Sequence, residues 1–153
     1  MSPDCVDLGT NPIEFTNKYS ATGNTTIYGH KTLEGRTLKA GEFTFTLSST
    51  DDPKFDTRVA SKSVTNDADG NFDFGVMNYN LEDAGKSYTY TVEETKGTDS
   101  TVTYSTVKYD VTITITDNGD GTLAVVQDRG TQNARLSFVN VYGAKGEVVF
   151  QAT

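Results

Sequence analysis

A strict alternation of apolar and polar residues constrains the fold of this chain more than any other feature of its sequence. In the segment 109–116, which reads Tyr-Asp-Val-Thr-Ile-Thr-Ile-Thr, every second residue is apolar and most of the others are threonine. A period of two places the two sets of side chains on opposite faces of a strand, so that one face is buried and the other stays in water. The same alternation recurs in the segments 42–47, 72–74, 88–94 and 136–140. The sequence therefore predicts a domain built from half-buried strands.

Turn residues separate these segments. The stretches 66–71 (Asn-Asp-Ala-Asp-Gly-Asn) and 117–121 (Asp-Asn-Gly-Asp-Gly) are rich in residues that tolerate a positive φ, as hairpin turns require. No segment keeps a helical apolar period for three turns, and 81–85 has room for one helical turn at most. The predicted fold is all-β, an antiparallel immunoglobulin-like β-sandwich.

Composition narrows the possible partners. The chain has 153 residues, a length that suits one domain, and a net charge of −8. Nucleic acids and anionic lipids attract basic surfaces, so we expect no nucleic-acid partner and no membrane partner. The one cysteine, Cys5, cannot form an internal disulfide, and we interpret residues 1–12 as a disordered or expression-derived lead-in. No apolar run approaches the length of a membrane span.

The two ends of the chain repeat each other. Residues 13–19 (Ile-Glu-Phe-Thr-Asn-Lys-Tyr) align with residues 136–142 (Leu-Ser-Phe-Val-Asn-Val-Tyr) at an offset of 123 positions, and the match continues without a gap to residue 150. Such a period indicates a tandem array in which each repeat contacts its neighbours. We therefore expect the end of a preceding repeat and a linker at 13–24, a complete repeat at 25–142, and a linker with the first strand of a next repeat at 143–153. The alternative is two similar strands within one sandwich.

Three polar residues occupy strand positions that should face the core. Lys31 shares its parity with Ile27 and Leu33, Glu94 follows Tyr90 and Val92 in alternation, and Asn140 lies between Phe138 and Tyr142. A buried charge or amide is costly unless it has a polar partner. We therefore predict that Lys31, Glu94 and Asn140 are partners of one another.

At this point the sequence resembles a known family, the isopeptide-containing repeat of streptococcal major pilins and related Gram-positive surface adhesins. The segments that carry the resemblance are 31–47, 88–94 and 138–142, together with the hairpin Asp-Asn-Gly-Asp-Gly-Thr-Leu at 117–123. The resemblance implies a Cna-B-like sandwich with an intramolecular amide bond. It implies that Lys31 and Asn140 are the crosslinked residues and Glu94 the catalytic carboxyl. Glu93, of opposite parity, stays open as the alternative acid.

The chemistry of such a bond follows from burial. An apolar core lowers the pKa of a lysine and raises the pKa of a carboxylic acid. Lys31 would then be a neutral nucleophile, and a protonated Glu94 would hydrogen-bond the Asn140 side-chain carbonyl and shuttle protons while ammonia leaves. The reaction occurs once and changes the protein itself, so we do not expect an enzyme, and it needs no cofactor and no metal. The alternative is an unreacted buried ion pair beside a hydrogen-bonded amide.

The expected function is that of a structural stalk repeat in an extracellular, cell-wall-anchored surface protein of a Gram-positive bacterium. The expected partners are neighbouring repeats of the same chain and, through another domain, a host surface ligand, whereas the isolated fragment is expected to be a monomer. A ligand-binding module for glycans or host matrix is the main alternative, with Tyr28 and Tyr79 as exposed aromatic candidates. The acidic loops at 66–71, 117–121 and 51–56 leave a calcium site open, although turn chemistry explains them better. The only histidine, His30, has parity opposite to Lys31 and is interpreted as a surface residue, which argues against a hydrolase.

Overall fold

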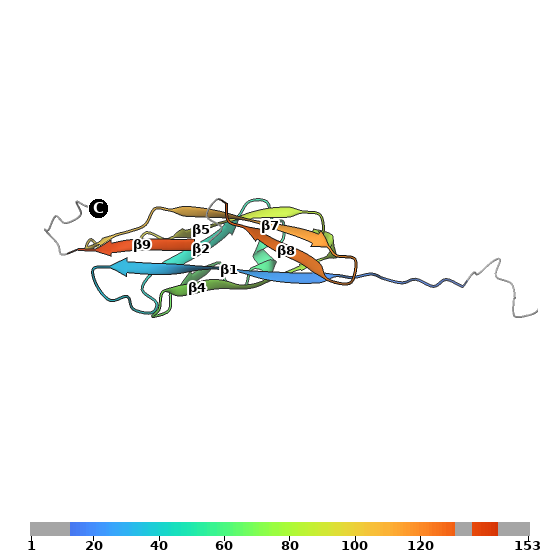
Figure 1. The fold of residues 1–153 in the computed structure, drawn as a ribbon, viewed down its shortest axis with the longest axis horizontal. Helices are drawn as coiled ribbons and strands as arrows, with labels where there is room; N and C mark the ends of the chain where they lie inside the picture. The colour runs from blue at the N-terminus through green and yellow to red at the C-terminus, as the bar shows by residue number, and fades with distance from the viewer. Residues whose placement is uncertain (1–12, 131–135, 144–153) are drawn as a thin grey trace, which may run out of the picture.

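The structure, a computed structural model, describes residues 13–130 and 136–143 and contains two β-sheets. It confirms the predicted all-β sandwich (Figure 1). The elements in chain order are β1 (Thr22–Glu34), β2 (Thr44–Ser49), α1 (Phe55–Arg58), β3 (Ser63–Thr65), β4 (Asn71–Asn80), η2 (Leu81–Asp83), β5 (Ser87–Glu94), β6 (Val102–Thr103), β7 (Lys108–Asp117), β8 (Leu123–Asp128) and β9 (Leu136–Tyr142). Where one helical turn was expected, the chain forms the 3-10 turn η2.

The two sheets pack face to face. One has the strand order β4-β1-β9-β6 and the other the order β3-β2-β5-β7-β8. All strand pairs are antiparallel except β1 and β9, the first and last strands described, which lie side by side in parallel. Because these two strands run in the same direction, the chain enters the sandwich at one end of its long axis and leaves at the other, as Figure 1 shows.

Alternation along the strands builds the core between the sheets. In β7, Val111, Ile113 and Ile115 are fully buried, and the threonines between them are partly or fully exposed, as the period of two predicts. Phenylalanine rings fill the middle of the core, where Phe45 stacks on Phe72 with ring centroids 3.9 Å apart. Burial of large apolar side chains of this kind is the main favourable contribution to folding.

A bulge in β4 corrects one expectation. Tyr79 was expected to be exposed, but only 1% of its surface is accessible. The pairing of β4 with β1 shifts by one residue near Gly75, whose φ is +86°. The extra residue moves the inward positions of β4 from Phe72 and Phe74 to Met77 and Tyr79. Tyr28 on β1 is 44% exposed, as expected.

The N-terminal boundary of the sandwich lies at the start of β1. Thr22 pairs with Asn80, and Ala21 just before it is buried. Residues 21–23 therefore pack with the sandwich, although they lie inside the segment 13–24 that we interpreted as the end of a preceding repeat and a linker. The predicted lead-in at 1–12 and residues 144–153 lie outside the described residues. Within the described ranges, no helix is long and apolar enough to cross a membrane.

Candidate crosslinking site

Strands from both sheets bring Lys31, Glu94 and Asn140 together. Lys31 lies on β1 opposite Phe138, and Asn140 lies two residues further along the neighbouring strand β9, so both side chains project from the same face of the sheet. Glu94 ends β5 in the facing sheet and reaches across the core. All three residues are buried, with 1%, 7% and 0% of their surfaces accessible.

The carboxyl group of Glu94 contacts both nitrogen atoms of the site. Lys31 Nζ donates a hydrogen bond to Glu94 Oε1 at 3.0 Å, and Asn140 Nδ2 donates to Glu94 Oε2 at 2.7 Å. The amine and the side-chain amide are thus bridged by one carboxyl group. A group placed in this way has the geometry for general acid–base work on both nitrogens, because each lies within hydrogen-bond distance of it.

The surroundings of Lys31 lower the pKa of its amine. Burial is the dominant influence and lowers the pKa of Lys31, while the hydrogen bond and the charge of Glu94 oppose it. An ammonium group has three N–H donors, but among the described residues Glu94 alone accepts a hydrogen bond from Nζ. The remaining neighbours are aromatic rings, with Nζ 4.6 Å from the ring centre of Phe43 and 6.0 Å from that of Phe45. A neutral amine requires fewer partners in this pocket.

A backbone amide that the sequence did not reveal holds the Asn140 carbonyl. The N–H of Ser105 donates to Asn140 Oδ1 at 2.7 Å. Because a backbone N–H can only donate, this contact fixes which side of the amide is oxygen and turns Nδ2 toward Glu94. We expected Glu94 to hydrogen-bond the carbonyl oxygen; in the structure Ser105 does so and Glu94 receives the Asn140 NH₂. Ser105 lies between β6 and β7, in irregular chain that carries no periodic signal.

The other candidates lie away from the buried site. Glu93 turns outward and its carboxylate is 3.7 Å from Lys108 Nζ. His30 is half-buried with its Nε2 2.9 Å from the backbone oxygen of Asp69, on the face opposite to Lys31. Glu94 is therefore the carboxyl within reach of the amine.

The acidic loops use their carboxylates to hold their own turns. Asp67 Oδ1 accepts hydrogen bonds from the backbone N–H groups of Asp69 and Asn71, and Asp117 Oδ1 accepts one from Gly119. The described residues contain no cluster of three or more His, Cys, Asp or Glu side chains suited to a metal ion. Turn chemistry accounts for these contacts.

A second buried polar cluster surrounds Arg58, at the end of α1. Its guanidinium donates hydrogen bonds to the carboxylates of Asp52 and Asp83, with both oxygens of each carboxylate engaged. Tyr90 and Tyr88 donate their hydroxyls to Asp52 and Asp83 respectively. Asp52, which belongs to one of the acidic loops considered for calcium, is thus a buried partner of arginine.

Two comparisons with known proteins gave matches. The family model of FctA, described as a Spy0128-like isopeptide-containing domain, matches residues 27–143. Among solved structures, the major pilin protein T-13 from Streptococcus pyogenes is similar at 20% identity with a TM-score of 0.47, over 82% of this chain and 55% of that one. The chain thus spans about half the length of that pilin. No curated protein sequence matches the chain significantly. The family match covers most of the sandwich, including Lys31, Glu94 and Asn140, and the chain therefore belongs to the Spy0128-like isopeptide-containing domain family.

Proposed function

We propose that this domain is a structural stalk repeat of a pilus-like surface protein, stabilised by an amide bond that forms spontaneously between Lys31 and Asn140. The observation that carries the proposal is the bridging position of the Glu94 carboxyl between Lys31 Nζ and Asn140 Nδ2. The carboxyl group therefore touches both the nitrogen that would attack and the nitrogen that would leave. The membership of the chain in an isopeptide-containing family supports the same conclusion.

The proposed reaction joins the amine to the amide carbon. Neutral Lys31 Nζ attacks Cγ of Asn140, and a C–N bond forms as the Cγ–Nδ2 bond breaks. Glu94 takes a proton from Nζ and gives one to Nδ2, which leaves as ammonia, so that the carboxyl ends the reaction unchanged. Folding holds the three groups together, and such proximity lowers a reaction barrier by roughly 7–11 kcal/mol.

Ser105 contributes to this reaction through its backbone. As Nζ approaches Cγ, negative charge develops on Asn140 Oδ1, to which the Ser105 N–H already donates at 2.7 Å. A fixed donor at that oxygen stabilises the tetrahedral intermediate, because it needs no reorganisation during the reaction.

The expected role in the cell follows from the mechanics of a crosslinked β-sandwich. The bond would tie β1 to β9, the strands through which the chain enters and leaves the described domain. Tension would pass directly from one strand to the other, and proteases would find no unfolded loop. We place the domain on the outside of a Gram-positive cell, in a wall-anchored protein whose partners are neighbouring repeats of its own chain. The crosslinking is a single turnover, so the domain is not an enzyme.

The mass of the purified chain tests the proposal. We expect the wild-type protein to weigh one ammonia less than its sequence, since one nitrogen is lost per crosslink. Lys31→Met and Glu94→Gln should each restore the full mass of the variant sequence, the first because it removes the nucleophile and the second because it removes the proton carrier. High-resolution mass spectrometry of the intact proteins measures the difference directly.

A matched lysine variant serves as the control. Lys62 lies on the surface, 2.9 Å from Asp56, and Lys62→Met should still lose one ammonia. A wild-type chain that keeps its full mass while folded would refute the crosslink and leave a buried Lys31–Glu94 ion pair.

Substitution of Ser105 separates its backbone donor from its side chain. Ser105→Pro deletes the N–H and should slow crosslinking by about 10²–10³-fold, the usual effect of losing one such donor. Ser105→Ala keeps the N–H and should react at nearly the wild-type rate, although it loses the hydrogen bond from Val107 N to Ser105 Oγ. The measurement is the crosslinked fraction in intact mass spectra taken at intervals after a short pulse of expression. Equal rates in two variants with matching near-ultraviolet circular dichroism would exclude this role for Ser105.

The structure gives little support to a ligand-binding module. Of the two aromatic candidates, Tyr79 is buried and Tyr28 lies 5.0 Å beneath the guanidinium of Arg129. One surface hollow, between α1 and β4, has a volume of about 210 Å³. Small-molecule sites commonly enclose about 300–1,000 Å³.

A further inference from the structure

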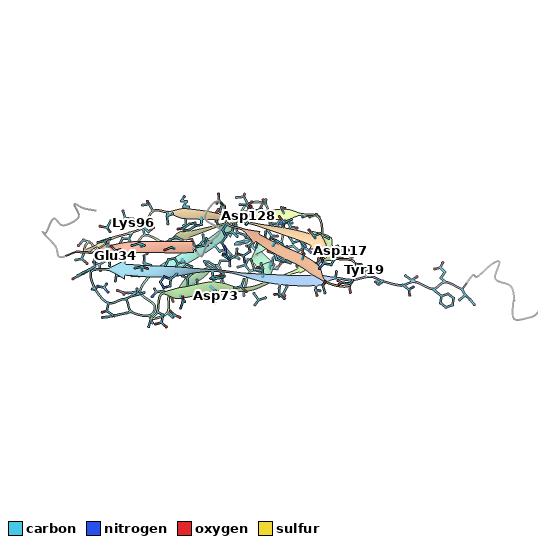
Figure 2. All side chains as sticks on the ribbon, in the orientation of Figure 1. Tyr19, Glu34, Asp73, Lys96, Asp117 and Asp128 are labelled. Atoms are coloured by element: carbon cyan, nitrogen blue, oxygen red, sulfur yellow. The ribbon has the colours of Figure 1, made fainter. Side chains whose placement is uncertain are left out.

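The chain just before β1 is fastened to a distant hairpin. The hydroxyl of Tyr19 donates to Asp117 Oδ1 at 2.7 Å and accepts from the backbone N–H of Gly121 at 3.1 Å. Thr22 N also donates to Gly121 O at 3.2 Å, and Ala21 between them is only 2% exposed. Figure 2 shows Tyr19 and Asp117 next to each other at the end of the sandwich where the N-terminal segment leaves it. Hydrogen bonds therefore fix the chain to the β7–β8 turn at the point where it enters the domain.

Upstream of this contact the chain exposes large apolar side chains. Residues 13–20 form no helix or strand, and Ile13 and Phe15 are 68% and 88% exposed. Burying such a side chain is worth about 1.5–3 kcal/mol, so a partner that covered both would be held by the contact. Asn17, the next residue of the same parity, is exposed as well.

The last strand of this domain identifies the partner. At the offset of 123 positions, Ile13, Phe15 and Asn17 correspond to residues of β9. Those counterparts, Leu136, Phe138 and Asn140, are 1%, 0% and 0% exposed. The sequence that is exposed before β1 is therefore the kind of sequence that this fold buries as its last strand. A sandwich that lacks only its last strand would cover it.

We propose that residues 13–19 are the last strand of a preceding repeat on the same chain, and that Asn17 is the crosslinked asparagine of that repeat. The hydrogen bonds of the Tyr19 hydroxyl with Asp117 and Gly121, which we call the clasp, then fasten this strand to the repeat that follows. This inference rests on the proposed crosslinking function. The bond to Asn17 forms as in the present domain: a lysine Nζ bonds to Cγ, and Nδ2 leaves as ammonia.

The clasp leaves little free chain between neighbouring crosslinks. Lys31 follows Asn17 by 14 positions, and of these, residues from Thr22 onward already lie extended in β1. Tyr19 and Ala21 are held against the following domain, so that only the residues next to Asn17 remain to form a joint. Consecutive repeats would then be joined stiffly, and tension would pass from one crosslink to the next through a nearly straight strand.

A tandem duplication tests the assignment of Asn17. Residues 13–135 are inserted ahead of residue 13, so that the original 13–19 follow a complete copy of the strands that precede β9. We expect this protein to lose two ammonia molecules, and only one when Asn17 at the junction is replaced by alanine. Asn24→Ala, at an exposed position in the downstream copy, is the matched control and should still lose two.

The outcomes separate the two proposals. Loss of a single ammonia by the duplicated chain would overturn the assignment of Asn17 while leaving the Lys31–Asn140 crosslink standing. Loss of none would overturn the crosslinking function itself.

The clasp is tested on the present chain. Tyr19→Phe removes the hydroxyl that meets Asp117 and Gly121, whereas Tyr28→Phe removes an exposed hydroxyl from β1 as a control. We expect heteronuclear ¹⁵N relaxation to show residues 19–21 as ordered as β1 in wild type and in Tyr28→Phe, and markedly less ordered in Tyr19→Phe. Unchanged order in Tyr19→Phe would eliminate the hydroxyl clasp.

Discussion

Stretched between its two ends, the wild-type domain is expected to lengthen far less than Lys31→Met. Asn140 follows Lys31 by 109 positions, and a crosslink between them keeps all of the intervening chain out of the path of tension. An unfolded chain extends by about 3.4 Å per residue, so that the variant should release roughly 370 Å more contour length than the wild type. Single-molecule force spectroscopy, with the domain held between reference domains of known length, measures this difference.

Two further variants test whether the difference in extension depends on the Lys31–Asn140 crosslink. Asn140→Ala removes the other crosslinked residue and should release the same extra length, while Lys62→Met should behave as the wild type. A wild-type domain that extends by its full length under force, in a sample whose mass shows the loss of ammonia, would place the crosslink elsewhere in the chain.

The sequence was sufficient to predict which faces of many strands are buried, but not which strands lie side by side. Alternation identified the buried faces of strands such as β7, because period two is a local property. The parallel pairing of β1 with β9 joins opposite ends of the chain, and no local pattern encodes it. The reversal of faces within β4 was equally hidden, because it depends on one extra residue at Gly75 whose φ of +86° becomes visible only once the strand is paired.

The alternation of inward and outward strand positions was enough to predict which residues form the site. Lys31, Glu94 and Asn140 stood out because polar residues occupied inward positions, and the structure places the three side chains in contact. The roles assigned to them stay predictions that the mass measurement decides. Ser105 escaped notice because its contribution comes from the backbone, which every residue type shares.

The Arg58 cluster was missed for a different reason. Asp51 and Asp52 look alike in sequence, as part of an acidic loop, yet Asp51 is exposed and Asp52 is buried against Arg58. The partners of Asp52 lie on α1 and β5, which only the tertiary fold brings to the loop. A short helix such as α1, of four residues, also gives no periodic signal.

Replacement of Arg58 by methionine is expected to lower the free energy of unfolding by about 3–5 kcal/mol, the usual cost of removing one partner from a buried ion pair. The side chains of Arg58, Asp52 and Asp83 are 4%, 0% and 4% exposed, so that the carboxylates depend on the guanidinium rather than on water for their partners. The two carboxylates would face each other without a counter-charge. Urea unfolding at neutral pH, followed by circular dichroism, measures the loss. Lys62→Met, which breaks an exposed pair with Asp56, should cost less than about 1 kcal/mol.

The same cluster predicts how this difference changes with pH. Burial alone would raise the pKa of Asp52 and that of Asp83, but hydrogen bonds from Arg58 and the neighbouring tyrosines outweigh it and leave both pKa values below the ordinary 3.8. A depressed pKa in the folded state contributes stability above the unfolded pKa, and that stability is lost as the pH falls through the folded value. The gap between wild type and Arg58→Met should therefore be widest near neutral pH and shrink below about pH 4. A gap that stays constant from pH 7 to pH 3 would mean that stacking of the guanidinium on Tyr79, rather than pairing with the carboxylates, accounts for the contribution of Arg58. The guanidinium carbon lies 4.1 Å from the centre of that ring.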